Sequence, residues 1–425
     1  MTRLDVYLHD DLVGRLERLQ HSLLRFEYAE EWVRKGRPPL SQSLPVRYEP
    51  FDDSEARPYF AGLLPEGMFL RDIAKYYSVS AGNAFSLLRA IGGECAGAIT
   101  LISPGEELPS ATSPKWMSSL DIEEMIRSLG QKPLALLEET DGLRLSLAGA
   151  QEKLPVLFEG GQIGITRGSP PSTHIVKIPD SRFPGLVANE GYCIGIAREL
   201  GLEVAEAQAR STSAFDHEPG VGEFLLVTRF DRQQLEDGRG WIRLHQEDFC
   251  QALGIVSEEK YEADGGPSLR DCARLLWDTS DLPARDLIDL VRAVLFNYII
   301  GNNDAHGKNF SMLREGPGTP RLAPLYDLVS TVSFEGLARK MAMKIGGEYR
   351  PDYVKLRHWE RFAEQVDLSV GIVRRQAKAL VDSLDRARDE AKERIGPEFA
   401  KQEVIERIDA QISRRSTWLR TELQL

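Results

Sequence analysis

A cluster of polar residues follows an apolar segment in the second half of the chain. Residues 301–310, with the sequence GNNDAHGKNF, come directly after the apolar run Val294 to Ile300. Asp304 and Asn309 are separated by four residues, the spacing with which kinase catalytic loops place a carboxylate on the acceptor hydroxyl and an amide oxygen on magnesium. The alternative is an Asn/Asp/Gly-rich turn whose side chains bond to neighbouring backbone groups. The spacing alone supports both interpretations equally.

A second acidic residue lies where a kinase would need a metal ligand. Asp327, in the segment Tyr326-Asp327-Leu328, comes eighteen residues after Asn309. Mg2+ takes oxygen ligands and keeps several waters, so one carboxylate and one amide suffice beside the phosphates of a nucleotide. The alternative role for Asp327 is a helix N-cap. Asn309 and Asp327 together favour a magnesium site.

A lysine and a small-residue loop lie upstream of these acids. Lys177 ends the apolar segment His174-Ile175-Val176-Lys177, a pattern typical of the lysine that neutralises nucleotide phosphates. Its expected ion-pair partner is Glu190, because a buried ammonium is costly without one. Alternatively, Lys177 reaches water from an edge strand. Residues 145–153, LSLAGAQEK, would let backbone N–H groups approach phosphates, but they match no glycine-rich fingerprint.

The elements that must hold these residues differ between the two halves of the chain. Prolines and small polar residues over 103–114 indicate a linker after a small mixed domain, 1–102. Apolar alternation predicts strands over 154–158, 163–165, 174–178 and 223–228, and helical spacing predicts helices over 187–200, 269–277 and 284–300. Asp121 is expected to cap a helix that runs through Met125 and Leu129. The expected class is α+β, with a strand-rich lobe over 115–232 and a mainly helical lobe over 233–425.

Composition excludes several classes of protein. Lys plus Arg number 53 against 65 Asp plus Glu, a net charge of −12, which argues against a surface that binds nucleic acid throughout. The four cysteines are scattered, without CxxC pairs, so we expect reduced core residues rather than disulfides or a zinc site. The acidic start and the absence of a long uncharged run predict a cytoplasmic protein without a membrane span.

Four ordered motifs resemble a known family. Residues 145–153, the stretch 227–232 (VTRFDR), residues 303–309 (NDAHGKN) and residues 326–328 (YDL) together resemble HipA-type serine/threonine kinases, the toxins of toxin–antitoxin modules. Residues 60–67 (FAGLLPEG) look like that family's N-terminal subdomain, so the resemblance covers nearly the whole chain. It implies a bilobal, protein-kinase-like fold with an N-terminal HipA subdomain.

The resemblance also implies roles for individual residues. Asp304 would be the catalytic carboxylate, Asn309 and Asp327 would hold Mg2+, and Lys177, paired with Glu190, would contact the phosphates of ATP. His306 could donate to the transferring phosphoryl group, and its protonation would then matter near neutral pH. The remaining ATP contacts would come from the phosphate-covering loop, the interlobe hinge and the catalytic segments: Ala148, Gly149, Ala150, Gln151, Glu152, Lys153, Thr228, Arg229, Phe230, Gly307, Lys308 and Tyr326.

Regulation and partners follow from the same resemblance. Ser146 stands where these kinases carry an autophosphorylated serine, and its phosphate would repel ATP phosphates and silence the enzyme; a serine that satisfies a turn is the alternative. The family acts with a separate helix-turn-helix antitoxin, HipB, so DNA would be contacted only indirectly. Arg374, Arg375 and Lys378 could touch DNA phosphates or form a solvated helix face.

Three functions are consistent with the sequence. The leading one is a growth-inhibiting protein kinase that phosphorylates a translation component such as an aminoacyl-tRNA synthetase. The second is a kinase-fold enzyme with a small-molecule acceptor. The third is a nucleotide-sensing co-repressor partner of a DNA-binding antitoxin, against which the presence of Lys177, Asp304, Asn309 and Asp327 argues.

Overall fold

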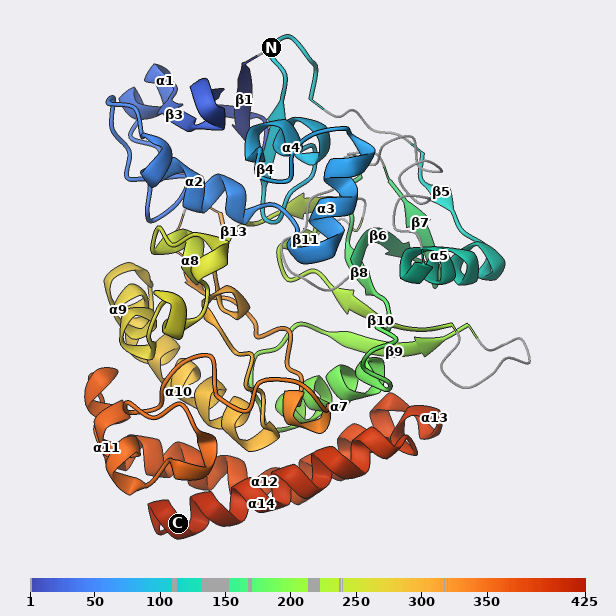
Figure 1. Cartoon of the computed structure of the whole chain (residues 1–425), viewed down its shortest axis with the longest axis vertical. Helices are drawn as coiled ribbons and strands as arrows, with labels where there is room; N and C mark the ends of the chain where they lie inside the picture. Colours follow the sequence, from blue (N-terminus) through green and yellow to red (C-terminus); the bar gives the residue numbers. More distant parts are fainter. Residues whose placement is uncertain are drawn as a thin grey trace. The chain divides into compact units, whose positions relative to one another are not determined.

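The chain forms two compact units. The computed structural model describes residues 2–108, 113–131, 153–166, 170–212, 222–236, 238, 240–316, 318 and 320–425 (Figure 1). Unit 1 comprises 1–178, 211–258 and 313–318, and unit 2 comprises 179–210, 259–312 and 319–425. The strands β9 (Ala207–Ser211) and β14 (Ser311–Arg314) lie where the chain passes between units. The domain boundaries expected near residues 102, 114 and 232 stay predictions.

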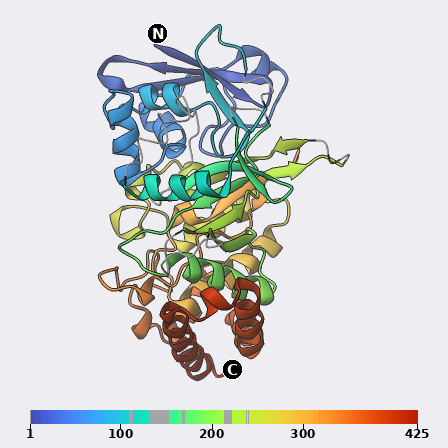
Figure 2. The same cartoon turned by 90° about the vertical axis from the view of Figure 1, so that its right-hand side faces the viewer.

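Unit 1 begins with an antiparallel sheet of strand order β3-β2-β1-β4, its first strands dark blue in Figure 2. The β1 strand alternates half-buried and buried residues because one face of a sheet packs on the core. Phe26, Phe51 and Phe60 pack together in that core. The elements are β1 (Arg3–Leu8), β2 (Asp11–Arg18), η1 (Gln20–Ser22), β3 (Leu24–Tyr28), α1 (Glu30–Arg34), α2 (Asp53–Gly62), α3 (Gly67–Tyr76), α4 (Ala84–Ile91) and β4 (Ile99–Ile102).

Unit 1 also contains a second sheet, in which neighbouring strands follow the order β5-β7-β6-β8-β10. Val156 and Val176, which belong to two of its strands, are fully buried and pack in one core cluster with Ile163 and Phe224. The four strands expected here are all present. The elements are β5 (Lys115–Trp116), α5 (Ser119–Gln131), β6 (Lys153–Glu159), β7 (Gln162–Ile165), β8 (His174–Lys177), β10 (Glu223–Thr228), β11 (Arg232–Gln234), β12 (Trp241–Arg243), β13 (His245–Asp248), α8 (Phe249–Ala252) and η2 (Ser257–Glu259).

The start of α5 differs from the sequence expectation. Asp121 lies inside the helix rather than at its cap, because the helix begins at Ser119. Its carboxylate accepts hydrogen bonds from the backbone N–H and the hydroxyl of Ser118, at 2.7 and 2.6 Å. Asp121 thus still stabilises the first turn, from within it.

Unit 2 is mainly helical. Its long helix α7 packs against α12 and α14, and α10 packs against α9, α12 and α14. Gly195 of α7 permits the close approach of α12, because a Cβ at this position would lie 3.1 Å from the Cβ of Ala391. The elements are α7 (Leu186–Glu199), η3 (Glu262–Asp264), α9 (Leu269–Thr279), α10 (Pro283–Ile300), η4 (Gly307–Asn309), β15 (Arg321–Leu322), η5 (Thr331–Ser333), η6 (Pro351–Tyr353), α11 (Leu356–Gln365), α12 (Val370–Ile395), α13 (Pro397–Ala400) and α14 (Glu403–Leu423).

The structure confirms the expected state of the cysteines and the expected fold class. All four cysteines are buried and free, as expected from their spacing. The α+β class is confirmed by the mixture of sheets and helices in unit 1 and the helices of unit 2. Among the helices of the described ranges, none has both the length and the apolar composition required to cross a bilayer.

Candidate active site

The polar loop predicted to be catalytic begins where α10 ends. Gly301 closes the helix with φ of 73°, a left-handed conformation that favours glycine. A Cβ at Gly301 would also lie 2.5 Å from Cγ2 of Val332 and 2.8 Å from Nε2 of Gln411. The chain therefore turns sharply out of a buried helix, which places residues 302–309 at one fixed position in unit 2.

Asn302 joins the two acidic motifs. Its Oδ1 accepts the backbone N–H of Asp304 at 3.1 Å, and its Nδ2 donates to the backbone carbonyl of Asp327 at 3.3 Å. Nδ2 also donates to Oδ1 of Asn297, one turn back in α10, at 2.9 Å. Because Asn302 is buried, it holds the backbone of both acids in one arrangement.

A second set of contacts fixes the same two segments. The backbone N–H of Asn303 donates to Oγ1 of Thr331 at 2.8 Å, and that hydroxyl donates to the carbonyl of Gly301 at 3.1 Å. The hydroxyl of Tyr326 donates to the carbonyl of Lys308 at 2.7 Å and lies 2.6 Å from Oγ of Ser311. The structure thus brings the predicted residues Asp304, Asn309 and Asp327 onto two segments that are cross-linked several times.

Asp304 is exposed, as a carboxylate that meets an acceptor must be. Its backbone carbonyl accepts Nδ2 of Asn309 at 3.1 Å and the N–H of His306 at 2.8 Å. Its Oδ1 accepts a hydrogen bond from the hydroxyl of Tyr261 at 2.7 Å. The sequence did not identify Tyr261 as part of the site. The sequence also allowed a turn whose side chains bond to neighbouring backbone groups. Such bonds are present, and they shape the loop around Asp304.

His306 is buried and uncharged at neutral pH. Burial, reinforced by the positive charges of Lys260 and Lys308, lowers the pKa of His306 to about 3, although Asp327 acts in the opposite direction. Its Nδ1 has no hydrogen-bond partner among the described residues. Desolvation thus favours the neutral ring in the chain by itself, and donation by His306 to a transferring phosphoryl group stays a prediction.

Asp327 has a backbone conformation rare for residues other than glycine. Its φ is 52°, and no helix begins at Asp327, so the N-cap alternative does not apply. Such left-handed residues cost free energy and persist where surrounding contacts hold them, as Asn302 does here. The conformation concentrates strain at a predicted metal ligand.

The side chains that could hold a cation suit Mg2+ shared with a nucleotide. The amide nitrogen of Asn309 donates to the carbonyl of Asp304, so it is the amide oxygen of Asn309 that could bind a cation. Asp327 supplies a carboxylate. Within the described part of the chain, no three His, Cys, Asp or Glu side chains gather closely enough to hold a metal ion. A site made of Asn309 and Asp327 therefore requires phosphate oxygens and water to complete it.

The predicted phosphate-binding lysines lie in unit 1. Lys153, at the start of β6, is directly opposite Lys177 of β8 in the antiparallel register, so both side chains point to the same face of the sheet. Lys177 is buried. Like charges directly opposite each other repel, so a negative group near them is stabilising. Glu190 lies in α7 of unit 2, where it is buried, and its pairing with Lys177 stays a prediction.

The predicted hinge follows β10. The N–H of Arg229 donates to the carbonyl of Thr173 at 3.0 Å, and Oγ1 of Thr228 lies 3.2 Å from Nε2 of His174. The N–H and the side chain of Arg229 are thus both engaged within the unit, and contact of the hinge residues Thr228, Arg229 and Phe230 with adenine stays a prediction.

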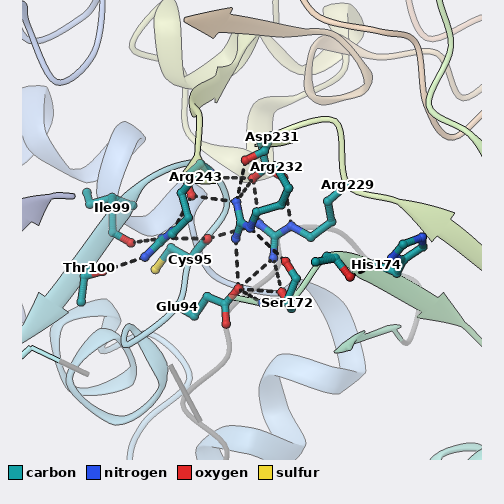
Figure 3. Close-up of polar contacts among 12 residues, drawn as sticks. Glu94, Cys95, Ile99, Thr100, Ser172, His174, Arg229, Asp231, Arg232 and Arg243 are labelled. Atoms are coloured by element: carbon teal, nitrogen blue, oxygen red, sulfur yellow. Dashed lines mark hydrogen bonds and ion pairs between the residues drawn. The ribbon is translucent and has the colours of Figure 1, made fainter. Parts of the chain in front are cut away.

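A buried ion cluster holds this hinge to the first hundred residues (Figure 3). Arg229 and Arg232 both approach Oε1 of Glu94, at 3.4 and 3.0 Å, and both pair with Asp231. Burial alone would raise the pKa of Glu94, but the charges of Arg232 and Arg229 outweigh it and lower that pKa. Arg243 completes the cluster by donating to Oγ1 of Thr100 at 2.8 Å and to the carbonyl of Ile99.

Some predicted residues lie outside the described part of the chain. They are Ser146 and the loop residues Ala148, Gly149, Ala150, Gln151 and Glu152. Of the basic residues considered for DNA contact, all on α12, Lys378 is exposed and pairs with Asp382 at 2.8 Å, one helical turn away. That pairing is typical of a solvated helix face.

Both sequence and structure comparisons point to one family. Residues 145–391 match the HipA-like C-terminal domain, and residues 4–102 match the HipA N-terminal domain. The chain is 41% identical to Y4mE of Sinorhizobium fredii, named as a candidate kinase, over 90% of each protein. It is 31% identical to the serine/threonine-protein kinase toxin HipA of Shewanella oneidensis, over 83% of this chain and 80% of that protein.

A solved structure agrees with these matches. The chain resembles one chain in the solved structure of the toxin–antitoxin complex of HipA, HipB and operator DNA from Shewanella oneidensis MR-1, with a TM-score of 0.81 and 28% identity, over 99% of this chain and 96% of that chain. Because both domain matches, the relatives and the fold coincide, this chain belongs to the HipA family.

Proposed function

We propose that the chain is an ATP-dependent serine/threonine protein kinase that acts as a growth-inhibiting toxin. The observation that carries this proposal is Asn302, whose single side chain bonds to the backbone of Asp304 and of Asp327. A carboxylate for the acceptor and a carboxylate for a cation are thereby held together, as phosphoryl transfer requires. The similarity to a kinase toxin of Shewanella oneidensis also supports it.

The proposed reaction assigns one task to each residue. Asp304 orients the acceptor hydroxyl and takes its proton as the hydroxyl oxygen bonds to the γ-phosphorus of ATP. The bond between that phosphorus and the β–γ bridging oxygen breaks, and ADP leaves. Asn309 and Asp327 would hold Mg2+, which when bound neutralises phosphate charge. Lys153 and Lys177 contribute further positive charge at the phosphates.

The finer features of the proposal concern partners and regulation. The solved relative is a complex of HipA with HipB and operator DNA, and we extend to this chain a separate HipB-like antitoxin that contacts DNA itself. The acceptor is a protein of the translation machinery such as an aminoacyl-tRNA synthetase. Phosphorylation of Ser146 by the enzyme itself would silence it, because the added negative charge repels ATP phosphates.

Mass spectrometry provides the test. Phosphatase-treated protein is incubated with Mg2+ and ATP, and intact masses and phosphopeptides are compared among wild type, Asp304→Ala and the control Asp281→Ala, an exposed acid in the same unit. We expect one added phosphoryl group, on Ser146, in wild type and in the control but not in Asp304→Ala. Circular dichroism of Asp304→Ala should show that the fold is intact.

Other outcomes separate the alternative functions. ATP consumption with transfer to a small molecule, and none to protein, would replace the protein kinase by a small-molecule kinase. ATP binding without any transfer in wild type would leave a nucleotide-sensing partner of a repressor. Equal transfer by Asp304→Ala would refute the role of Asp304.

A further inference from the structure

Tyr261 makes a contact with the candidate catalytic carboxylate that the sequence did not reveal. Its hydroxyl donates a hydrogen bond to Oδ1 of Asp304 at 2.7 Å. Its ring packs edge-on against the ring of His306, with centroids 5.2 Å apart and an interplanar angle of 85°. Tyr261 therefore touches two residues of the loop, although it lies 43 positions before Asp304 in the chain.

The turn that carries Tyr261 is tightly closed. The carbonyl of Tyr261 accepts the N–H of Asp264 at 2.9 Å and the N–H of Gly266 at 2.8 Å. Gly265 has φ of 107°, and a Cβ on Gly266 would lie 2.7 Å from the carbonyl oxygen of Tyr261. Two glycines in succession thus permit a turn that no pair of larger residues would form without strain.

The next residue anchors this turn to a second segment of unit 2. The N–H of Glu262 donates to the carbonyl of Ala342 at 3.2 Å, and its carboxylate accepts the N–H of Lys344 at 2.6 Å. The ammonium of Lys344 lies 3.3 Å from the other carboxylate oxygen of Glu262. These contacts hold the turn that carries Tyr261 in place.

The backbone of Asp304 is fixed independently of its side chain. Asn302 binds its N–H, and Asn309 and His306 bind its carbonyl. These contacts leave rotation about the side-chain bonds as the freedom that decides where the carboxylate points. A phenol held 2.7 Å from Oδ1 restricts that rotation.

We propose that Tyr261 is a positioning residue that sets the orientation of the Asp304 carboxylate toward the acceptor hydroxyl. This inference rests on the proposed kinase function. A hydrogen bond to a charged group contributes more than one between neutral groups, and catalysis depends steeply on the orientation of a reacting group. Loss of the hydroxyl should therefore slow the transfer step and leave nucleotide binding unchanged.

Self-phosphorylation kinetics test the inference. The rate of phosphoryl incorporation is measured against ATP concentration, with saturating Mg2+, for wild type, Tyr261→Phe, Asp304→Ala and Tyr353→Phe. Tyr353 is an exposed tyrosine elsewhere in unit 2 and serves as the matched control. We expect Tyr261→Phe to lower the maximal rate about 10- to 100-fold, with the half-saturating ATP concentration within about twofold, and Tyr353→Phe to match wild type.

The outcomes distinguish this inference from the function on which it rests. If wild type transfers phosphate and Asp304→Ala does not, but Tyr261→Phe is as fast as or faster than wild type, Tyr261 has no positioning role. A faster variant would mean that the phenol blocks the acceptor position. If wild type itself transfers nothing, the kinase proposal fails first.

A structural readout tests the inference without any activity. A crystal structure of Tyr261→Phe should show the Asp304 carboxylate in more than one orientation, or rotated, while the backbone of residues 301–309 is unchanged. A carboxylate that keeps a single orientation, the same as in a crystal structure of the wild type, would overturn the inference.

Discussion

Arg232 and Glu94 form an ion pair, with Nη2 3.0 Å from Oε1, in which both side chains are at most 2% exposed. Glu94 belongs to the segment that matches the HipA N-terminal domain, and Arg232 to the segment that matches the C-terminal domain. The same Glu94 oxygen accepts the hydroxyl of Ser172 at 2.6 Å. The two family domains are therefore joined within unit 1 by charges that water does not reach.

Removal of the Glu94 charge should destabilise the protein strongly. Glu94→Gln leaves Arg229 and Arg232 buried with less compensating charge, and breaking a buried pair from one side costs about 3–5 kcal/mol. Urea unfolding followed by fluorescence measures the loss of unfolding free energy. Glu31→Gln is the control, since Glu31 pairs with Lys35 in an exposed position and should change stability little. Equal effects of the two substitutions would contradict the structural importance of the cluster.

Stability should depend on pH through Glu247. Burial raises the pKa of Glu247 from 4.5 to about 7, although Ser41 and Gln42 donate hydrogen bonds to it at 2.5 and 3.0 Å. Because the folded state binds this proton more tightly than the unfolded state, the stabilisation is present below pH 4.5 and is lost as pH rises through 7.

Glu247→Gln tests this dependence, since the amide resembles the protonated acid. The unfolding free energy of the variant relative to wild type should increase by roughly 1–3 kcal/mol between about pH 5 and pH 8. Urea titrations at the two pH values measure it. A difference that stays constant with pH would show that the carboxyl group titrates in its ordinary range.

Asn302 should be needed for phosphoryl transfer although it contacts neither acceptor nor metal in the proposed mechanism. Asn302→Ala removes the contacts to Asp304 and Asp327 and leaves buried backbone groups unpaired, at about 1–3 kcal/mol of stability. We expect a fall in the maximal transfer rate of about 100-fold, in line with the cost of misplacing reacting groups. Asn302→Asp keeps an oxygen for the Asp304 N–H but loses the donor to Asp327. Its maximal transfer rate should therefore lie between those of wild type and Asn302→Ala. Full activity of Asn302→Ala would refute the role of this link.

Asp327 should set the magnesium requirement. Asp327→Asn removes a charged oxygen ligand, so the Mg2+ concentration for half-maximal transfer should rise at least about tenfold. Loss of a residue that only supports a metal ligand already lowers metal affinity by about 10- to 100-fold, and loss of the ligand itself should cost no less. Titration of Mg2+ at fixed ATP measures this, and binding of ATP without Mg2+ is the control that should change little. An unchanged Mg2+ dependence would assign the metal to other ligands.

Local spacing determined much of the candidate site. The Asp304–Asn309 pair, the acid at Asp327 and the helix that precedes them are short-range patterns, because a helix period and a turn depend on neighbouring residues. The sequence also singled out Lys153 and Lys177, but the register that places them opposite each other comes from the folded sheet. The assigned roles of these residues stay proposals until the kinetics are measured.

Long-range contacts account for what the sequence did not reveal. Tyr261 meets Asp304, Asn302 reaches the backbone of Asp327, and Glu94 meets Arg229, over 43, 25 and 135 positions respectively. No periodicity signals such pairs, because each depends on how turns and helices pack in three dimensions. The residue types and spacing thus determined which chemistry the chain could perform. Only the tertiary structure decided which side chains hold the reacting groups in place, because burial and hydrogen-bond geometry exist only after the chain has folded.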